Sequence, residues 1–232
     1  MVTRPMLKRL FALFPVLLAQ CAGALVPVAD AETNAGPPRW ESEIRAFESA
    51  DKTNPPPPDA VLFVGSSSIR LWKTLAQDFR EYHVINRGFG GSEIADSVAF
   101  AERIVIPCRP KTIVLYAGDN DLAAGKSPQH VFAGFKAFVQ KIQAALPGTR
   151  IAFLSIKPSP SRWHLAGEIK TANRMIGDFC RRKKRLIYID VFHPMLGPDG
   201  KPRAELFVED RLHLNPKGYA LWTRIIRSRL QE

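Results

Sequence analysis

The sequence predicts an α/β fold in which helices cover both faces of a five-stranded parallel sheet. Two observations lead to this prediction. From residue 60 onward, short β-branched runs alternate with helical patterns, and the expected strands are apolar along most of their length. Strands that are buried on both faces lack the polar and apolar alternation of half-exposed ones. With 232 residues, the chain is long enough for one such domain but short for two.

Ten elements are expected after residue 59, with strands and helices in alternation. The expected strands are Ala60–Val64, His83–Asn86, Thr112–Ala117, Arg150–Ser155 and Leu186–Asp190. The expected helices lie near Ile69–Ala76, at Glu93–Ile104, at Pro128–Ala145, near Leu165–Cys180 and at Pro216–Leu230. The last helix is the best marked, because Asn215 can cap it and Pro216 suits its first position.

The N-terminal residues 1–31 have the pattern of a signal peptide. Basic residues precede the apolar run Leu10–Leu18, and Ala29-Asp30-Ala31 is a small-x-small cleavage site. A membrane anchor is the alternative, but Pro15 and Gln20 interrupt a run that would need about 20 continuous apolar residues. We therefore expect an exported protein, periplasmic or secreted. Residues 32–58 would form a short helix and a Pro-rich linker ahead of the main domain at 59–232.

The formal net charge of +11 at pH 7 raises the question of an anionic partner. The densest basic cluster, Arg181–Arg185, is expected at a helix end, where cations offset the negative end of the macrodipole. No zinc-ligand spacing or RNA-binding signature accompanies it, so no nucleic-acid partner is predicted. Contact with an anionic cell surface stays open, as does a disulfide between Cys108 and Cys180.

A serine-rich turn follows the first expected strand. In open parallel sheets, ligands and chemistry gather beyond the carboxyl ends of the strands. Here the strand runs into Gly65-Ser66-Ser67-Ser68 and then into a helix. A serine at such a turn has its hydroxyl over the sheet edge, near the N–H groups of the helix start. Taken alone, the same turn is more typical of a helix cap.

The next two strands also end in polar or glycine-rich motifs. The segment Asn86–Ser92, NRGFGGS, has three glycines in four positions, which is typical of backbone that approaches a ligand closely. A dinucleotide site is the alternative, but the full glycine fingerprint is missing. The third strand leads into Gly118–Asp121, GDND, where Asn120 can donate an amide N–H to a developing oxyanion. A simple turn is the alternative there.

Near the C-terminus, Asp210 stands three residues before His213. This spacing can bring a carboxylate and an imidazole to one side of a turn. The carboxylate can then hold the ring in one tautomer and stabilise the imidazolium, as a catalytic triad requires. An isolated Asp-x-x-His pair is more often an exposed pair without a catalytic role. The order of all the motifs along the chain is therefore stronger evidence for a triad than this pair alone.

That order resembles the SGNH (GDSL-like) hydrolase family. The motifs VGSSS, NRGFGG, GDND and DRLH look like its four sequence blocks, and VLFVGSSSIRLW and IVLYAGDNDL are similar to its platelet-activating-factor acetylhydrolase and lysophospholipase-like branch. The resemblance implies a flavodoxin-like three-layer sandwich. It also implies a nucleophile at Ser67, a triad completed by Asp210 and His213, and an oxyanion hole made by the backbone N–H groups of Ser67 and Gly91 with the side chain of Asn120.

One departure from the family concerns the nucleophile, because the usual Gly-Asp-Ser is here Gly65-Ser66-Ser67. Any of the three adjacent serines could be the nucleophile. When the glycine of the family motif is aligned with Gly65, its serine falls on Ser67. By the resemblance, the activity is hydrolysis of carboxylic esters with short acyl chains, on a small ester, an acylated glycan or a lysolipid. No metal or cofactor is implied.

Two rival functions remain at this stage. One is a polysaccharide O-acetyltransferase that uses the same triad, and the other is a non-catalytic module that binds glycans or lipids. Fold alone settles neither. The candidates for the pocket walls are Trp72, Phe89 and residues 155–164. The oligomeric state is not predicted.

Overall fold

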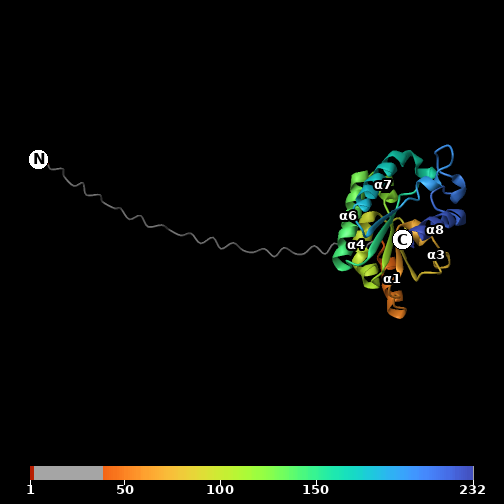
Figure 1. Ribbon diagram of the computed structural model, residues 1–232, viewed down its shortest axis with the longest axis horizontal. Helices are drawn as coiled ribbons and strands as arrows, with labels where there is room; N and C mark the ends of the chain where they lie inside the picture. Colours follow the sequence, from red (N-terminus) through yellow and green to blue (C-terminus); the bar gives the residue numbers. More distant parts are fainter. Residues whose placement is uncertain (3–38, 232) are drawn as a thin grey trace, which may run out of the picture. The chain divides into compact units, whose positions relative to one another are not determined.

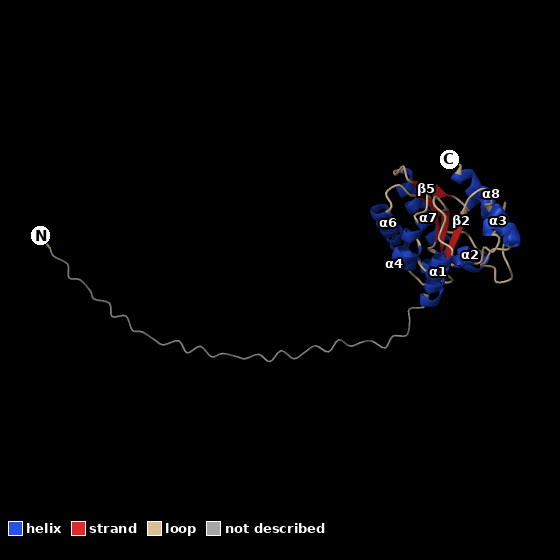
Figure 2. Ribbon diagram, turned by 90° about the horizontal axis from the view of Figure 1, so that it is seen from below, coloured by secondary structure: helices blue, strands red, loops and turns tan. Residues whose placement is uncertain are grey.

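The computed structural model describes residues 1, 2 and 39–231, so the predicted signal peptide falls almost wholly outside the described residues. Residues 39–231 form an α/β body around a five-stranded parallel sheet with strand order β2-β1-β3-β4-β5 (Figure 2). The strands are β1 (Val61–Gly65), β2 (Val84–Gly88), β3 (Thr112–Tyr116), β4 (Arg150–Leu154) and β5 (Leu186–Ile189). The predicted fold class is confirmed.

The sheet is buried on both faces because alternate residues of each strand enter different cores. Successive side chains of a strand point to opposite faces. In β1, Leu62 and Val64 belong to one apolar cluster, whereas Val61 and Phe63 belong to the other. This double burial explains why the strands read as continuous apolar runs in the sequence.

Helices cover both faces, as Figure 1 shows, with α4, α6 and α7 gathered on one side of the sheet and α3 and α8 on the other. The first face carries α1 (Glu41–Thr53), α4 (Ile94–Ile104), α6 (Pro128–Ala145) and α7 (Ala166–Arg181). The second carries α2 (Ser67–Arg70), α3 (Leu75–Asp78) and α8 (Pro216–Leu230). Within the described residues, none of these helices has the length and apolarity to cross a membrane.

Shorter elements fill the connections between these helices and strands. The helix α5 (Asp119–Ala123) follows β3 directly. The 3-10 turns are η1 (Ile106–Cys108), η2 (Pro160–Leu165), η3 (His193–Met195) and η4 (Ala204–Leu206).

The helix expected near residues 69–76 is instead two short helices, α2 and α3, with a break between them. At the break, the ring of Trp72 enters a cluster of aromatic side chains, where it stacks on Tyr219 with centroids 4.9 Å apart. Its indole N–H donates to Asp78 Oδ2 at 2.6 Å, and the Thr74 hydroxyl donates to the same oxygen. Burial of this one large side chain therefore outweighs continuation of the helix.

Helix α1 packs on the main body rather than standing apart from it. Its Ile44 is fully buried in the first core. The indole N–H of Trp40 donates to the carbonyl of Gly90 at 2.9 Å, and Asp51 pairs with the buried Arg87. The helix thus braces the glycine-rich segment that follows β2.

The two cysteines among the described residues, Cys108 and Cys180, are free thiols and both are buried. Cys108 donates to the carbonyl of Ile104 in the first core. Burial raises the pKa of both thiols, that of Cys180 to about 12. The disulfide that the sequence left open is therefore not present.

Candidate active site

Three loops meet at the carboxyl edge of the sheet. The last residue of β1, Gly65, pairs in register with Gly88 of β2 and with Tyr116 of β3. The segments that follow these strands therefore emerge side by side, at the switch point where β1 has neighbours on both sides. A Cβ at Gly65 would lie 1.9 Å from the Tyr116 carbonyl oxygen, and its φ is 134°. Only glycine lets the strands come this close.

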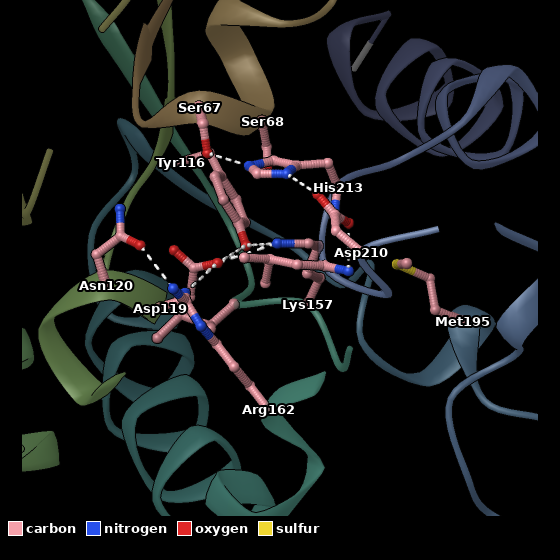
Figure 3. Close-up of polar contacts among 12 residues, drawn as sticks. Ser67, Ser68, Tyr116, Asp119, Asn120, Lys157, Arg162, Met195, Asp210 and His213 are labelled. Carbon is pink, nitrogen blue, oxygen red and sulfur yellow. Dashed lines mark hydrogen bonds and ion pairs between the residues drawn. The ribbon is translucent and has the colours of Figure 1, made fainter. Parts of the chain in front are cut away.

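The structure brings the three residues of the expected triad together. The Ser67 hydroxyl lies 2.9 Å from Nε2 of His213, and Nδ1 of the same ring lies 2.5 Å from Asp210 Oδ2 (Figure 3). Ser67 opens α2, whereas the other two residues stand on the loop before α8. The arrangement matches the catalytic triad of serine hydrolases, in which a hydroxyl, an imidazole and a carboxylate are hydrogen-bonded in that order.

A tight turn holds Asp210 against the histidine. The Oδ1 atom of Asp210 accepts hydrogen bonds from the backbone N–H groups of Leu212 at 2.8 Å and of His213 at 2.9 Å. Its Oδ2 atom is therefore left to pair with the imidazole ring. Arg211, inside the turn, has a left-handed φ of 58°. Partial burial raises the pKa of Asp210, but the hydrogen bonds from His213 outweigh this effect and bring it to about 2. The group is therefore a carboxylate at neutral pH.

Of the three adjacent serines, only Ser67 reaches the histidine. Ser66 and Ser68 are each 1% exposed, and their hydroxyls have no hydrogen-bond partner among the described residues. Ser67 is half-buried. Alternate residues of this turn thus face the interior and the site.

The groups expected in the oxyanion hole lie on the segments that follow β1, β2 and β3. Within the described residues, the backbone N–H groups of Ser67 and Gly91 have no acceptor. Gly91 has a φ of 73°, a conformation that favours glycine. The Asn120 side chain donates to the Ser92 carbonyl at 2.9 Å, which ties the segment after β3 to the segment after β2. A second N–H of that amide stays available to a ligand.

A second Asp-x-x-His pair exists that sequence reasoning missed. Nδ1 of His193 lies 2.6 Å from Asp190 Oδ2, and Oδ1 of this carboxylate accepts the His193 backbone N–H at 3.2 Å. The spacing was visible in the sequence and could have been found. The His193 side chain is 75% exposed, and among the described residues its ring contacts no serine. The local motif therefore makes the same side-chain hydrogen bonds twice, although only the Asp210 turn contains a left-handed residue. Among the described residues, only the Asp210–His213 copy faces a hydroxyl.

A buried polar cluster lies beside Asn120 and was also missed. Asp119 Oδ2 accepts Nζ of Lys157 at 3.0 Å and the Tyr116 hydroxyl at 3.2 Å, and Nη1 of Arg162 lies 3.2 Å from it. These contacts join β3 to the segment after β4, so no local sequence pattern signals them. Figure 3 shows the cluster below the triad.

Two residues proposed as pocket walls do not serve that role. Trp72 and Phe89 are 1% and 0% exposed, and each is part of an apolar core. Of the candidate segment 155–164, Lys157 is buried and Arg162 keeps partial exposure. In residues 39–231, the His, Cys, Asp and Glu side chains form no group of three that could hold a metal ion.

The Asp121 carboxyl, next to Asn120, should make stability depend on pH. It is fully buried, and burial raises its pKa from 3.8 to about 6 although Ile94 donates a backbone N–H to it. A raised pKa means that the folded state holds this proton more tightly than the unfolded state does. The contribution to stability is thus complete below about pH 4 and is lost as the pH rises through 6.

We therefore expect Asp121→Asn to raise the free energy of unfolding at pH 7.5 by on the order of 2 kcal/mol, with little change at pH 4. Urea unfolding at both pH values measures this difference. An equal shift at the two pH values would mean that titration of Asp121 is not the cause.

Comparison with known proteins identifies the family. The model of the GDSL-like Lipase/Acylhydrolase family matches residues 60–221, which is more than half of the chain and spans every motif described above. The chain belongs to this family. The family consists of carboxylic ester hydrolases, and the fold of this GDSL-like hydrolase agrees with the one that the sequence motifs implied.

A curated relative resembles the chain in sequence, and two solved structures resemble it in fold. The GDSL-like hydrolase is 27% identical over 216 residues to the platelet-activating factor acetylhydrolase IB subunit alpha1 of Bos taurus, covering 88% of this chain and 86% of the relative. A GDSL-like lipase from Bacteroides thetaiotaomicron superposes with a TM-score of 0.72 at 18% identity, over 82% of this chain and 98% of the other. An acetyl xylan esterase, AlAXEase, superposes with a TM-score of 0.63 at 21% identity, over 74% and 99%. At these identities, the structures show a shared fold.

Proposed function

We propose that this GDSL-like hydrolase is a serine esterase that transfers the acyl group of a carboxylic ester to Ser67 and then to water. The observation that carries the proposal is the hydrogen-bonded series from Ser67 through His213 to Asp210, with distances of 2.9 and 2.5 Å. A hydroxyl is a weak nucleophile until a neighbouring base removes its proton.

In the first half-reaction, Nε2 of His213 takes the proton of the Ser67 hydroxyl as the oxygen attacks the ester carbonyl carbon. The Asp210 carboxylate keeps the proton of the ring on Nδ1, so that Nε2 is free to accept, and it stabilises the imidazolium that forms. The tetrahedral intermediate then expels the alcohol, which receives its proton from His213. An acyl-enzyme remains on Ser67.

The negative charge on the carbonyl oxygen needs donors that are already in position. We assign this role to the backbone N–H groups of Ser67 and Gly91 and to the side-chain amide of Asn120. In the second half-reaction, His213 takes a proton from water, the hydroxide attacks the acyl carbon, and the Ser67 oxygen leaves with the proton that His213 returns.

Exposure of the site favours substrates with short acyl chains. The side chains of His213 and Asp210 are 27% and 46% exposed, which fits an open groove rather than a deep apolar pocket. The large apolar side chains after β4, Trp163 and Leu165, pack against the first core instead of covering the serine.

We therefore expect kcat/KM for p-nitrophenyl esters to fall or level off beyond about four acyl carbons, because an exposed methylene gains less than the ~0.8 kcal/mol of full burial. A series from acetate to laurate tests this. A steady rise to twelve carbons would instead favour a lipase or lysophospholipase.

One assay separates hydrolysis from the two rival functions. Purified mature protein is incubated with p-nitrophenyl acetate, with and without an acceptor glycan. An esterase releases acetate in both cases, an O-acetyltransferase acetylates the glycan, and a binding module does neither.

We also propose that the protein is exported, since residues 1–31 have a signal-peptide pattern. The mature chain should then begin near Glu32. N-terminal sequencing of protein from the producing cell tests the proposal, and soluble cytoplasmic protein that retains Met1 would contradict it.

A further inference from the structure

The Asn120 amide is held at both ends, and the two partners allow only one orientation. Its Oδ1 accepts Nη2 of Arg162 at 3.0 Å, and its Nδ2 donates to the Ser92 carbonyl at 2.9 Å. A guanidinium can only donate and a carbonyl can only accept. If the amide turned over, it would bring two donors together at one end and two acceptors at the other.

Arg162 is itself fixed by a buried carboxylate. Its Nη1 lies 3.2 Å from Oδ2 of Asp119, whose side chain is 7% exposed. Lys157, with a side chain that is 1% exposed, pairs with the same oxygen at 3.0 Å, and the Tyr116 hydroxyl donates to it. Burial raises the pKa of Asp119, but Lys157 and Arg162 outweigh this effect and keep it below its usual value. The group is thus a carboxylate at neutral pH, next to the Arg162 guanidinium.

The segment that carries Arg162 also contacts the triad loop. Arg162 lies in η2, and the neighbouring Ser161 donates its backbone N–H to the carbonyl of Arg211 at 3.2 Å. Arg211 stands between Asp210 and His213. The same short turn therefore contacts both the expected oxyanion donor and the loop that carries Asp210 and His213. Figure 3 shows the contact of Arg162 with Asn120.

We propose that Arg162 is a positioning residue that orients the Asn120 amide for oxyanion stabilisation, with Asp119 as its anchor. The inference rests on the proposed function, in which Asn120 donates to the oxyanion. With Oδ1 held by Arg162, Nδ2 directs one N–H to Ser92 and keeps the other for the substrate. Without Arg162, the amide can rotate and present an oxygen lone pair to the developing negative charge.

The test is a double-mutant cycle with Arg162→Ala, Asn120→Ala and the double variant, assayed on p-nitrophenyl acetate. Asn120→Ala should lower kcat by ~10²- to 10³-fold with little change in KM, since the contact forms mainly in the transition state. Arg162→Ala should lower kcat by roughly 10- to 100-fold, again with KM nearly unchanged. In the Asn120→Ala background, loss of Arg162 should cost less than about threefold, because there is no amide left to orient.

Two further variants exclude a merely structural role. Arg162→Lys keeps a cation beside Asp119 but cannot make both of the arginine's contacts, so kcat should still fall by about tenfold. Millimolar guanidinium chloride should restore part of the activity of Arg162→Ala and none of that of the double variant. Arg181→Ala is the matched control, because the side chain of this arginine is 72% exposed and, in the described part of the chain, forms an ion pair with the surface residue Asp178 alone. It should match the wild type.

Three results would overturn the inference. They are an unchanged kcat in both Arg162 variants, a loss that appears in KM, and a loss of equal size with and without Asn120. Failure of the proposed function looks different, because Ser67→Ala and Asn120→Ala would then also turn over normally.

Discussion

Ser67→Ala should lower kcat for ester hydrolysis by roughly 10⁴- to 10⁶-fold, the range expected for loss of a triad nucleophile. The reason is that the Ser67 hydroxyl is the group within reach of His213, at 2.9 Å. The measurement is kcat on p-nitrophenyl acetate with purified variant, after exclusion of contaminating esterase.

The adjacent serines provide matched controls. Ser66 and Ser68 lie in the same turn, are each 1% exposed, and have unpartnered hydroxyls among the described residues. Loss of such a hydroxyl leaves no partner unsatisfied, so Ser66→Ala and Ser68→Ala should keep activity within about threefold of the wild type. Normal turnover by Ser67→Ala, or a collapse confined to one of the neighbours, would refute the assignment of the nucleophile.

The second large effect is expected for Asp210→Asn, at about 10⁴-fold in kcat. An asparagine of the same shape keeps the turn but favours the tautomer in which Nε2 carries the proton. His213 could then no longer accept the proton of Ser67.

The chain contains its own control for this substitution. Asp190→Asn makes the same change in a carboxylate with the same hydrogen-bond pattern, 2.6 Å from His193, at a pair whose side chains contact no serine in the described region. Its activity should stay within about twofold of the wild type, as for most surface substitutions. Equal losses in the two variants would indicate a general effect on folding rather than a role in the triad.

The strands were predictable from the sequence, whereas the break between α2 and α3 and the short helix α5 were not. Expected and observed strand bounds differ by at most two residues at either end, as in Thr112–Tyr116, because both faces of the sheet are buried and polar residues mark the strand ends. The break between α2 and α3 follows from the packing of Trp72 against Tyr219, which lies at the other end of the chain. No local sequence pattern predicts a contact between residues so far apart in the chain.

The candidate site likewise has features that the sequence predicts and features that depend on contacts between distant residues. Three of its four motifs follow strands, so the fold itself predicts that these three meet, and the resemblance to a family names the roles of all four. Spacing alone could not choose between Asp210–His213 and Asp190–His193, because both pairs have the same spacing and make the same side-chain hydrogen bonds. The contact of Arg162 with Asn120 spans 42 residues and depends on the course of the segment after β4. Such contacts appear only in three dimensions.

Covalent labelling with a fluorophosphonate tests the central proposal most directly. An activated serine displaces fluoride and keeps the phosphonyl group, and fragmentation of the tryptic peptide that ends at Arg70 distinguishes the three adjacent serines. We expect a single adduct on Ser67, absent from Ser67→Ala and present in Ser66→Ala and Ser68→Ala. An adduct on Ser66 or Ser68, or ester hydrolysis by a protein that takes no label, would contradict the assignment of Ser67 as the nucleophile.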